Sequence, residues 1–266
     1  MKYKVIALDL DGTLLDSKKK VSDKNREALD KARKQGAIVC LASGRPVYGI
    51  RNVSDALCME EKGGYILAFN GGKVIDCRTQ EVIWDVKIPD ELVPQIYDFA
   101  VKHQVNLVTY RDNDMLTFSA DNEFARFEAM INGLNVVEEK NMLDVIDFPV
   151  NKFLITEAPG VVEVLEKEMR QCFPQLSIYR SEPFFLEIVP QNIEKSYALS
   201  KIAQKEGITA EQFISFGDGY NDISMIEYAG MGIAMANANE ECKKRADDVT
   251  LSNDEDGVAY ALEKYL

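Results

Sequence analysis

Short apolar segments that alternate with helical patterns constrain this chain more than any other feature of its sequence. KVIALDL at 4–10, AIVCLAS at 37–43 and YILAFN at 65–70 are apolar almost throughout. Continuous apolar segments of this length predict strands that are buried on both faces, as in parallel sheets. Helical patterns at 22–36 and 46–59 separate the three segments. The chain is therefore expected to have an α/β fold, with a Rossmann-like parallel-sheet core and helices on both faces.

The same alternation returns near the C-terminus, after a segment of different character. Helical patterns at 193–207, 221–230, 239–247 and 257–266 surround strands expected at 213–218 and 231–236. Between the two regions, alternating strands accompany amphipathic helices at 90–104 and 159–171. A chain of 266 residues is long enough for a second domain. We therefore expect a core domain formed by 1–85 and 185–266, with an inserted α+β cap domain at 86–184.

Composition and charge limit the partners and the chemistry. The formal net charge of −13 argues against nucleic acid or an anionic membrane as the main partner. The single histidine, His103, argues against Ser-His-Asp catalysis and histidine metal sites, so acid–base chemistry falls to carboxylates. Five scattered cysteines without a Cys-x-x-Cys motif, and no apolar run of about 18 residues, predict a cytoplasmic protein without disulfides or a membrane segment.

Polar residues follow several of the expected strands at the point where each strand ends. They are Asp9 and Asp11 after the first strand, Ser43 after the second, Asn70 after the third, and Asp218, Asn221 and Asp222 after the strand at 213–218. The carboxyl ends of parallel strands meet at one edge of the sheet, where open α/β sheets bind their ligands. Carboxylates that converge there repel one another unless a cation neutralises them. Oxygen ligands without histidine indicate Mg²⁺.

Each motif taken alone has a simpler interpretation. A single aspartate at a strand end is more often a helix N-cap or a turn residue. GDGYND at 217–222 could be an Asx-rich loop, although it lacks the closing glutamate of an EF-hand and the third glycine of a dinucleotide-binding fingerprint. The ordered combination of Asp-x-Asp-Gly-Thr, Ser-Gly-Arg, a lysine and Gly-Asp-x-x-Asn-Asp is much harder to explain by unrelated turns.

This combination resembles the haloacid dehalogenase superfamily of phosphatases. The residues that carry the resemblance are DLDGTLLD at 9–16, LASGRP at 41–46, Lys195 in NIEKS, and FGDGYNDISMI at 216–226. FNGG at 69–72, FFLEIVP at 184–190 and NDEDGVAYAL at 253–262 are similar to segments of its Cof-type sugar phosphatases. The resemblance implies a Mg²⁺-dependent phosphatase that hydrolyses phosphate monoesters of small metabolites through an aspartyl-phosphate intermediate. Sugar phosphates are the expected substrates.

The resemblance also implies roles for the carboxylates. Asp9 would be the nucleophile that attacks phosphorus, and Asp11 would be the general acid and then the general base. Asp9, the backbone carbonyl of Asp11 and Asp218 would coordinate Mg²⁺. Asp222 would support this set.

A second group of residues would contact the phosphoryl group. It comprises Ser43, the N–H groups of Leu10 and Gly44, Lys195 and Asn221. Lys195 would also neutralise the nucleophile. Arg45 is expected either to position substrate or to form a structural ion pair. The family usually has threonine where Ser43 lies and glycine where Ser196 follows the lysine, but neither difference removes a required group.

Other functions use related chemistry. A phosphomutase or phosphotransferase would pass the phosphoryl group from Asp9 to a sugar instead of water. A signalling receiver domain also uses an aspartate, Mg²⁺ and a lysine, but it is a single compact unit without a large insertion. A catalytically inactive binding protein is disfavoured because every member of the constellation is present. The sequence does not indicate the oligomeric state. The cap is expected to move as a hinged domain on its two linkers and to contact the leaving group.

Overall fold

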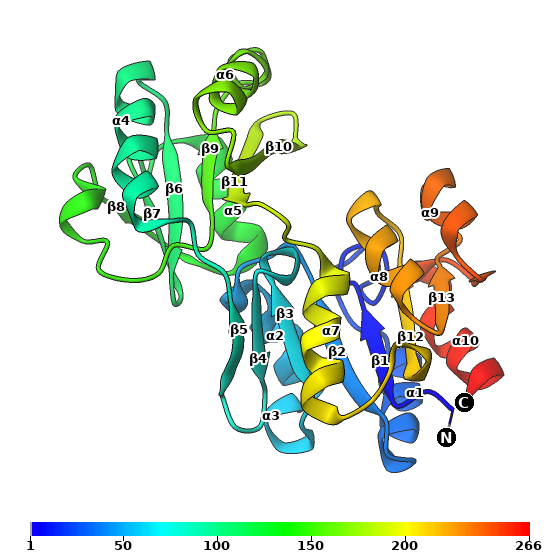
Figure 1. The fold of residues 1–266 in the computed structure, drawn as a ribbon. Coiled ribbons are helices and arrows are strands. Elements are labelled where there is room, and N and C mark those ends of the chain that lie inside the picture. The colour runs from blue at the N-terminus through cyan, green and yellow to red at the C-terminus, as the bar shows by residue number, and fades with distance from the viewer. Residues whose placement is uncertain (1) are drawn as a thin grey trace. The chain divides into compact units, whose positions relative to one another are not determined.

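The computed structural model describes residues 2–266, which form two compact units (Figure 1). The first unit comprises 2–44, Ile50–Trp84 and Glu194–Leu266. The second comprises Arg45–Gly49 and Asp85–Ile193. Within 2–266, every helix is too short or too polar to span a bilayer.

The first unit is built on an eight-stranded sheet with the order β14-β13-β12-β1-β2-β3-β4-β5. The strands from β14 to β3 are parallel, and β4 runs antiparallel to β3. The strands are β1 (Val5–Leu8), β2 (Ile38–Ala42), β3 (Tyr65–Ala68), β4 (Lys73–Asp76), β5 (Val82–Asp85), β12 (Phe213–Gly217), β13 (Met231–Ala234) and β14 (Asp248–Val249). Every residue of β1 is buried, as its continuous apolar sequence predicts.

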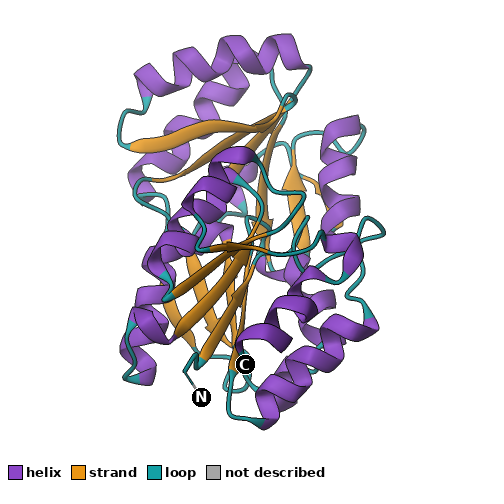
Figure 2. Cartoon of the chain, turned by 90° about the vertical axis from the view of Figure 1, so that its right-hand side faces the viewer, coloured by secondary structure: helices purple, strands orange, loops and turns teal. Residues whose placement is uncertain are grey.

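Helices cover both faces of this sheet (Figure 2). They are α1 (Asp23–Lys34), α2 (Val47–Ala56), α3 (Met59–Lys62), α7 (Lys195–Glu206), α8 (Ile223–Tyr228), α9 (Glu240–Arg245) and α10 (Gly257–Tyr265). Val5 and Ala7 of β1 pack in one apolar cluster with residues of α7 and α8. Ser22 caps α1 by accepting a hydrogen bond from Asn25 N, as its position before the helical pattern predicts. The expected α/β core is confirmed.

The second unit contains a six-stranded sheet with the order β10-β11-β9-β6-β7-β8. Its strands are β6 (Leu107–Arg111), β7 (Asp114–Thr117), β8 (Asn135–Glu138), β9 (Phe153–Thr156), β10 (Leu176–Glu182) and β11 (Phe185–Pro190). Its helices are α4 (Val93–His103), α5 (Glu123–Asn132) and α6 (Pro159–Cys172). Most strand pairs are antiparallel, and α4 and α6 share a large apolar core with the sheet. This is the inserted α+β domain.

The second unit extends beyond the boundaries expected from the sequence. Strand β11 pairs with β9 and β10, whereas residues from 185 onward are expected from the sequence in the core domain. A fully buried apolar strand carries no local signal for the sheet that it joins, so its pairing partners decide its place. Arg45–Gly49 also belongs to this unit, where Tyr48 packs against an apolar cluster that includes residues of α5.

The order of strands in the first unit positions the polar residues. Strand β1 lies between β12 and β2, and β3 follows β2. All four are parallel, so the residues after Leu8, Gly217, Ala42 and Ala68 emerge at the same edge of the sheet.

Candidate active site

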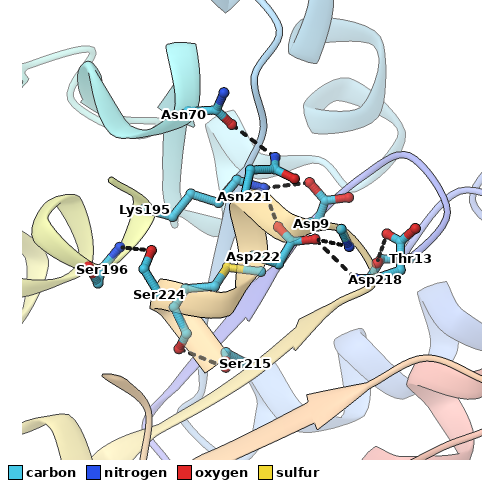
Figure 3. Close-up of polar contacts among 12 residues, drawn as sticks. Asp9, Thr13, Asn70, Lys195, Ser196, Ser215, Asp218, Asn221, Asp222 and Ser224 are labelled. Carbon is cyan, nitrogen blue, oxygen red and sulfur yellow. Dashed lines mark hydrogen bonds and ion pairs between the residues drawn. The ribbon is translucent and has the colours of Figure 1, made fainter. Parts of the chain in front are cut away.

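Lys195 joins two carboxylates at this edge. Its Nζ lies 2.6 Å from Asp9 Oδ1 and 2.6 Å from Asp222 Oδ1 (Figure 3). The side chain of Lys195 is completely buried, and Asp9 and Asp222 are nearly so. Burial favours the neutral amine, but the carboxylates of Asp222 and Asp9 raise the pKa of Lys195 above its ordinary value. The lysine is therefore a fixed positive charge between two aspartates.

Local structure explains how these three side chains meet. Asp9 directly follows β1, and its N–H continues the pairing with β12 by donating to Phe216 O. Lys195 is the first residue of α7, which packs on the sheet. Asp222 lies in the turn before α8. Gly71 has a φ of +97°, and a Cβ there would lie 2.7 Å from Glu194 O, so only glycine allows the turn after β3 to approach the start of α7.

Asp218 completes a cluster of three carboxylates. One oxygen each from Asp9, Asp218 and Asp222 lies within 4.8 Å of the others. Thr13 Oγ1 donates a hydrogen bond of 2.8 Å to Asp218 Oδ1. Gly12 has a φ of +82°, and a Cβ on it would lie 2.4 Å from Asp218 Oδ2. The loop after β1 therefore touches Asp218 directly, and any side chain at position 12 would collide with it.

Asp222 organises the loop that carries Asp218. Its Oδ2 accepts hydrogen bonds from Asp218 N at 3.0 Å and Gly219 N at 2.8 Å, while its Oδ1 binds Lys195. Both oxygens of Asp222 are thus already engaged within the protein. This arrangement favours a supporting role for Asp222 and leaves Asp9 and Asp218 as the more available metal ligands.

The electrostatics of the cluster suit a divalent cation. Burial, then the neighbouring Asp222, raise the pKa of Asp9 well above its ordinary value, although Lys195 opposes this shift. Burial and Asp222 raise the pKa of Asp218 to about 6, while the Thr13 hydroxyl opposes the rise. One lysine does not balance three carboxylates, two of which are buried. A hard cation with oxygen ligands, such as Mg²⁺, fits both the donor set and the excess negative charge.

Although its charge acts on Asp218, the side chain of Asp11 is not one of the three carboxylates of this cluster. Its Oδ1 accepts an ion-paired hydrogen bond of 2.7 Å from Lys19 Nζ, and both side chains are partly exposed. A backbone carbonyl of Asp11 as metal ligand therefore stays a prediction. Leu10 is fully buried, and its carbonyl accepts from Thr13 N and Leu15 N in the tight loop after β1.

The second and third strand ends meet through Ser43 and Asn70. Ser43 is buried, its N–H donates to Leu67 O, and its carbonyl accepts from Asn70 N. Asn70 adopts a left-handed conformation with φ 56°, and its Oδ1 accepts from Asn221 Nδ2 at 3.0 Å. The site of a Cβ on Gly44 lies 3.1 Å from Asn70 Nδ2. The predicted phosphate contacts Ser43, Gly44 and Asn221 thus share one neighbour, Asn70.

Arg45 belongs to the second unit. Its Nη1 donates to Gly49 O at 3.1 Å. The two alternatives for Arg45, substrate positioning and a structural ion pair, both remain predictions, because this hydrogen bond goes to a backbone carbonyl.

Two contacts at the site are not predicted by the sequence. Thr13 forms part of the Asp-Gly-Thr motif, but the motif alone does not indicate its bond to Asp218. Its signal was the glycine before it, because a left-handed Gly12 turns the chain back toward the edge of the sheet. Lys19 carried no usable signal, because it is one of three consecutive lysines in a loop.

Known proteins are similar to this chain over almost its whole length. Residues 6–262 match the family of haloacid dehalogenase-like hydrolases. A crystal structure of such a hydrolase from Bacteroides thetaiotaomicron is 44% identical, with a TM-score of 0.96 over 100% of both chains. The subclass IIB sugar phosphatase BT4131 is 29% identical, with a TM-score of 0.83 over 98% of both chains. The 5-amino-6-(5-phospho-D-ribitylamino)uracil phosphatase YcsE of Bacillus subtilis is 32% identical over 99% of this chain and 96% of its own. The chain therefore belongs to the haloacid dehalogenase-like hydrolase family.

Proposed function

We propose that this protein is a Mg²⁺-dependent phosphatase that hydrolyses phosphate monoesters of small metabolites, sugar phosphates above all, through an aspartyl-phosphate intermediate. One observation carries the proposal. Asp9, at the end of the first strand, meets a fully buried lysine and shares a carboxylate cluster with Asp218 and Asp222. A structural ion pair would need one carboxylate for one lysine, and three clustered carboxylates, two of them buried, destabilise a fold unless they serve another purpose.

The residues divide the chemistry between them. A carboxylate oxygen of Asp9 attacks phosphorus, and the leaving-group oxygen takes a proton from Asp11 as its bond to phosphorus breaks. Asp11 then removes a proton from water, whose oxygen attacks the phosphorus of the aspartyl-phosphate, releases inorganic phosphate and restores Asp9. The partly exposed position of Asp11 allows it to exchange protons with solvent.

Charge stabilisation accounts for most catalysis of phosphoryl transfer. Asp9 and Asp218, with the Asp11 carbonyl, would hold Mg²⁺, which neutralises phosphoryl charge when bound. Lys195 supplies a second positive charge beside Asp9. Ser43, Asn221 and the N–H groups of Leu10 and Gly44 would orient the phosphoryl oxygens. These local groups let an acidic protein bind an anionic substrate, because distant surface charge is screened over about 8 Å at physiological salt.

The names of two relatives support a hydroxyl-rich leaving group. BT4131 is called a sugar phosphatase, and YcsE is named for a substrate that carries a phosphorylated ribityl chain. Both names describe phosphate esters of carbon chains with several hydroxyl groups. We extend that substrate class to this chain.

The second unit contains a group of polar and charged side chains that we call the Lys152 cluster (Tyr110, Glu128, Lys152 and Glu187). Lys152 Nζ lies 2.8 Å from Glu187 Oε2, and Tyr110 OH donates to Glu128 Oε1 at 2.6 Å. Lys152, Glu128 and Glu187 are all buried. We propose that this unit is a cap domain, and that the charged hydrogen bonds of the Lys152 cluster stabilise its interior.

Phosphate release by the purified protein tests the proposal. We expect Mg²⁺-stimulated release from sugar phosphates and from a chromogenic aryl phosphate, and loss of activity with EDTA. No release from either class in the presence of Mg²⁺ would contradict it. Isotope-labelled water then separates hydrolysis from transfer, because only a phosphatase places the water oxygen in the released phosphate, whereas a phosphomutase returns the phosphoryl group to a sugar.

A further inference from the structure

Two asparagines, Asn237 and Asn239, bridge the two loops that carry the candidate metal ligands. Asn237 contacts the loop after β1, which contains Asp9 and Asp11, and Asn239 contacts the loop after β12, which contains Asp218. We propose that this asparagine bridge is a positioning device that sets the separation of Asp9 and Asp218 and thereby the affinity for Mg²⁺. The inference rests on the proposed function, in which these carboxylates hold the metal.

On the first loop, Asn237 forms a hydrogen bond with the backbone of Gly12, which has a left-handed conformation. Its Nδ2 donates a hydrogen bond of 2.7 Å to Gly12 O, the carbonyl of the left-handed glycine. Its Oδ1 accepts from Asn253 N at 3.0 Å, and Asn253 Nδ2 donates to Leu15 O at 2.9 Å. Asn237 and Asn253 therefore anchor the backbone that follows Asp11. The segment that begins at Asn253 has no role in the proposed catalysis, and this contact gives it one.

On the second loop, Asn239 holds the carbonyl of a candidate ligand itself. Its backbone N–H donates to Asp218 O at 3.1 Å, and its Nδ2 donates to the same oxygen at 3.2 Å. Its Oδ1 separately caps α9 by accepting from Cys242 N at 2.8 Å. Ala238, the residue between the two asparagines, is buried, which fixes this short segment in the fold.

The physical need for a bridge follows from the charges. Asp9 and Asp218 repel each other electrostatically, and Thr13 of the first loop joins the two loops directly through its hydrogen bond to Asp218. In the protein without metal, repulsion favours separation of the loops. Mg²⁺ requires near-octahedral oxygen ligands at about 2.0–2.1 Å, so even a small separation weakens binding. Hydrogen bonds from one rigid segment to both loops oppose that separation.

The test measures Mg²⁺ binding directly, by calorimetric titration and by the increase in melting temperature on adding Mg²⁺ to protein freed of metal. We expect Asn237→Ala to raise the dissociation constant for Mg²⁺ about 5- to 10-fold. This is the size expected for one lost hydrogen bond in a preorganised site. The melting temperature without metal should change much less than the Mg²⁺-dependent increase. Asn135→Ala is the matched control, because its amide donates to Asp114 on the surface of the second unit.

A second variant separates bridging from helix capping. Asn239→Ser keeps an acceptor for the N-cap of α9 but removes the side-chain donor to Asp218 O, so it should fold like the wild type and bind Mg²⁺ more weakly. Wild-type Mg²⁺ affinity in both Asn237→Ala and Asn239→Ser would overturn the inference, even if phosphatase activity is found. Absence of phosphatase activity in a wild-type protein that binds Mg²⁺ would instead contradict the proposed function and leave the bridge standing.

Discussion

Thr13 and Asp218 are 205 positions apart in the sequence, yet Thr13 Oγ1 donates a hydrogen bond of 2.8 Å to Asp218 Oδ1. This bond favours the ionised form of Asp218 against the effects of burial and of Asp222. In Thr13→Val the pKa of Asp218 should rise further above about 6. Protons then compete better with Mg²⁺, so the Mg²⁺ concentration for half-maximal activity should increase about 5-fold at pH 6.5 and less at pH 8. Thr13→Ser should restore the wild-type value, and an equal change in both substitutions would contradict this.

Replacing Lys195 should destabilise the first unit strongly. Lys195→Met leaves Asp9 and Asp222 buried without their shared positive partner, which typically costs about 3–5 kcal/mol. Urea unfolding in EDTA measures the loss, and added Mg²⁺ should recover part of it. Lys264→Met removes an exposed pair with Asp248 and is expected to change the free energy of unfolding much less. Similar losses for the two substitutions would argue against a buried charge cluster.

Substitutions of Asp9 and Asp11 should distinguish the role of the nucleophile from the role of the acid–base catalyst. Asp9→Asn is expected to abolish turnover of every substrate, because no aspartyl-phosphate can form. Asp11→Asn should reduce kcat for sugar phosphates about 10²–10⁴-fold. With an aryl phosphate, whose leaving group needs little protonation, Asp11→Asn should still release one equivalent of phenol in a burst. Steady turnover without a burst would show that another group activates the water.

Stability without metal should depend on pH through Asp218. Burial raises the pKa of Asp218 to about 6 in the folded protein, compared with an ordinary value of 3.8. Between these values the folded state binds more protons than the unfolded state, so the free energy of unfolding falls as pH rises from about 4 to 6. The expected contribution is on the order of 1–2 kcal/mol. Melting curves in EDTA should show this fall in the wild type and a smaller fall in Asp218→Asn, whereas identical profiles would contradict it.

Lys152→Met should destabilise the second unit. It leaves Glu187 buried without its positive partner, which typically costs about 3–5 kcal/mol. Lys167→Met, which removes an exposed charge on α6, is the control. Equal losses of unfolding free energy in the two variants, measured by urea unfolding, would argue against a stabilising Lys152 cluster.

The sequence predicts the site better than it predicts the boundaries of the units. The proximity of Asp9 and Asp218 is predictable because parallel strands place their carboxyl ends on one edge, whatever their separation along the chain. The sheet that β11 joins is not predictable, because FLEIVP is apolar enough for either sheet and its pairing is decided by distant strands. Side-chain partners such as Lys19 for Asp11 depend on loop conformation, which no periodicity encodes.

The discontinuous first unit has a consequence for synthesis on the ribosome. Strand β1 pairs with β2 early, but its other edge stays open until β12 is translated. At about 5–20 residues per second, that exposure lasts on the order of 10–40 s. The contiguous Asp85–Ile193 emerges in the meantime and can fold first. An unfinished chain thus exposes the unpaired edge of β1, which can pair with other chains. The need for chaperone binding should be greatest just before β12 pairs with β1.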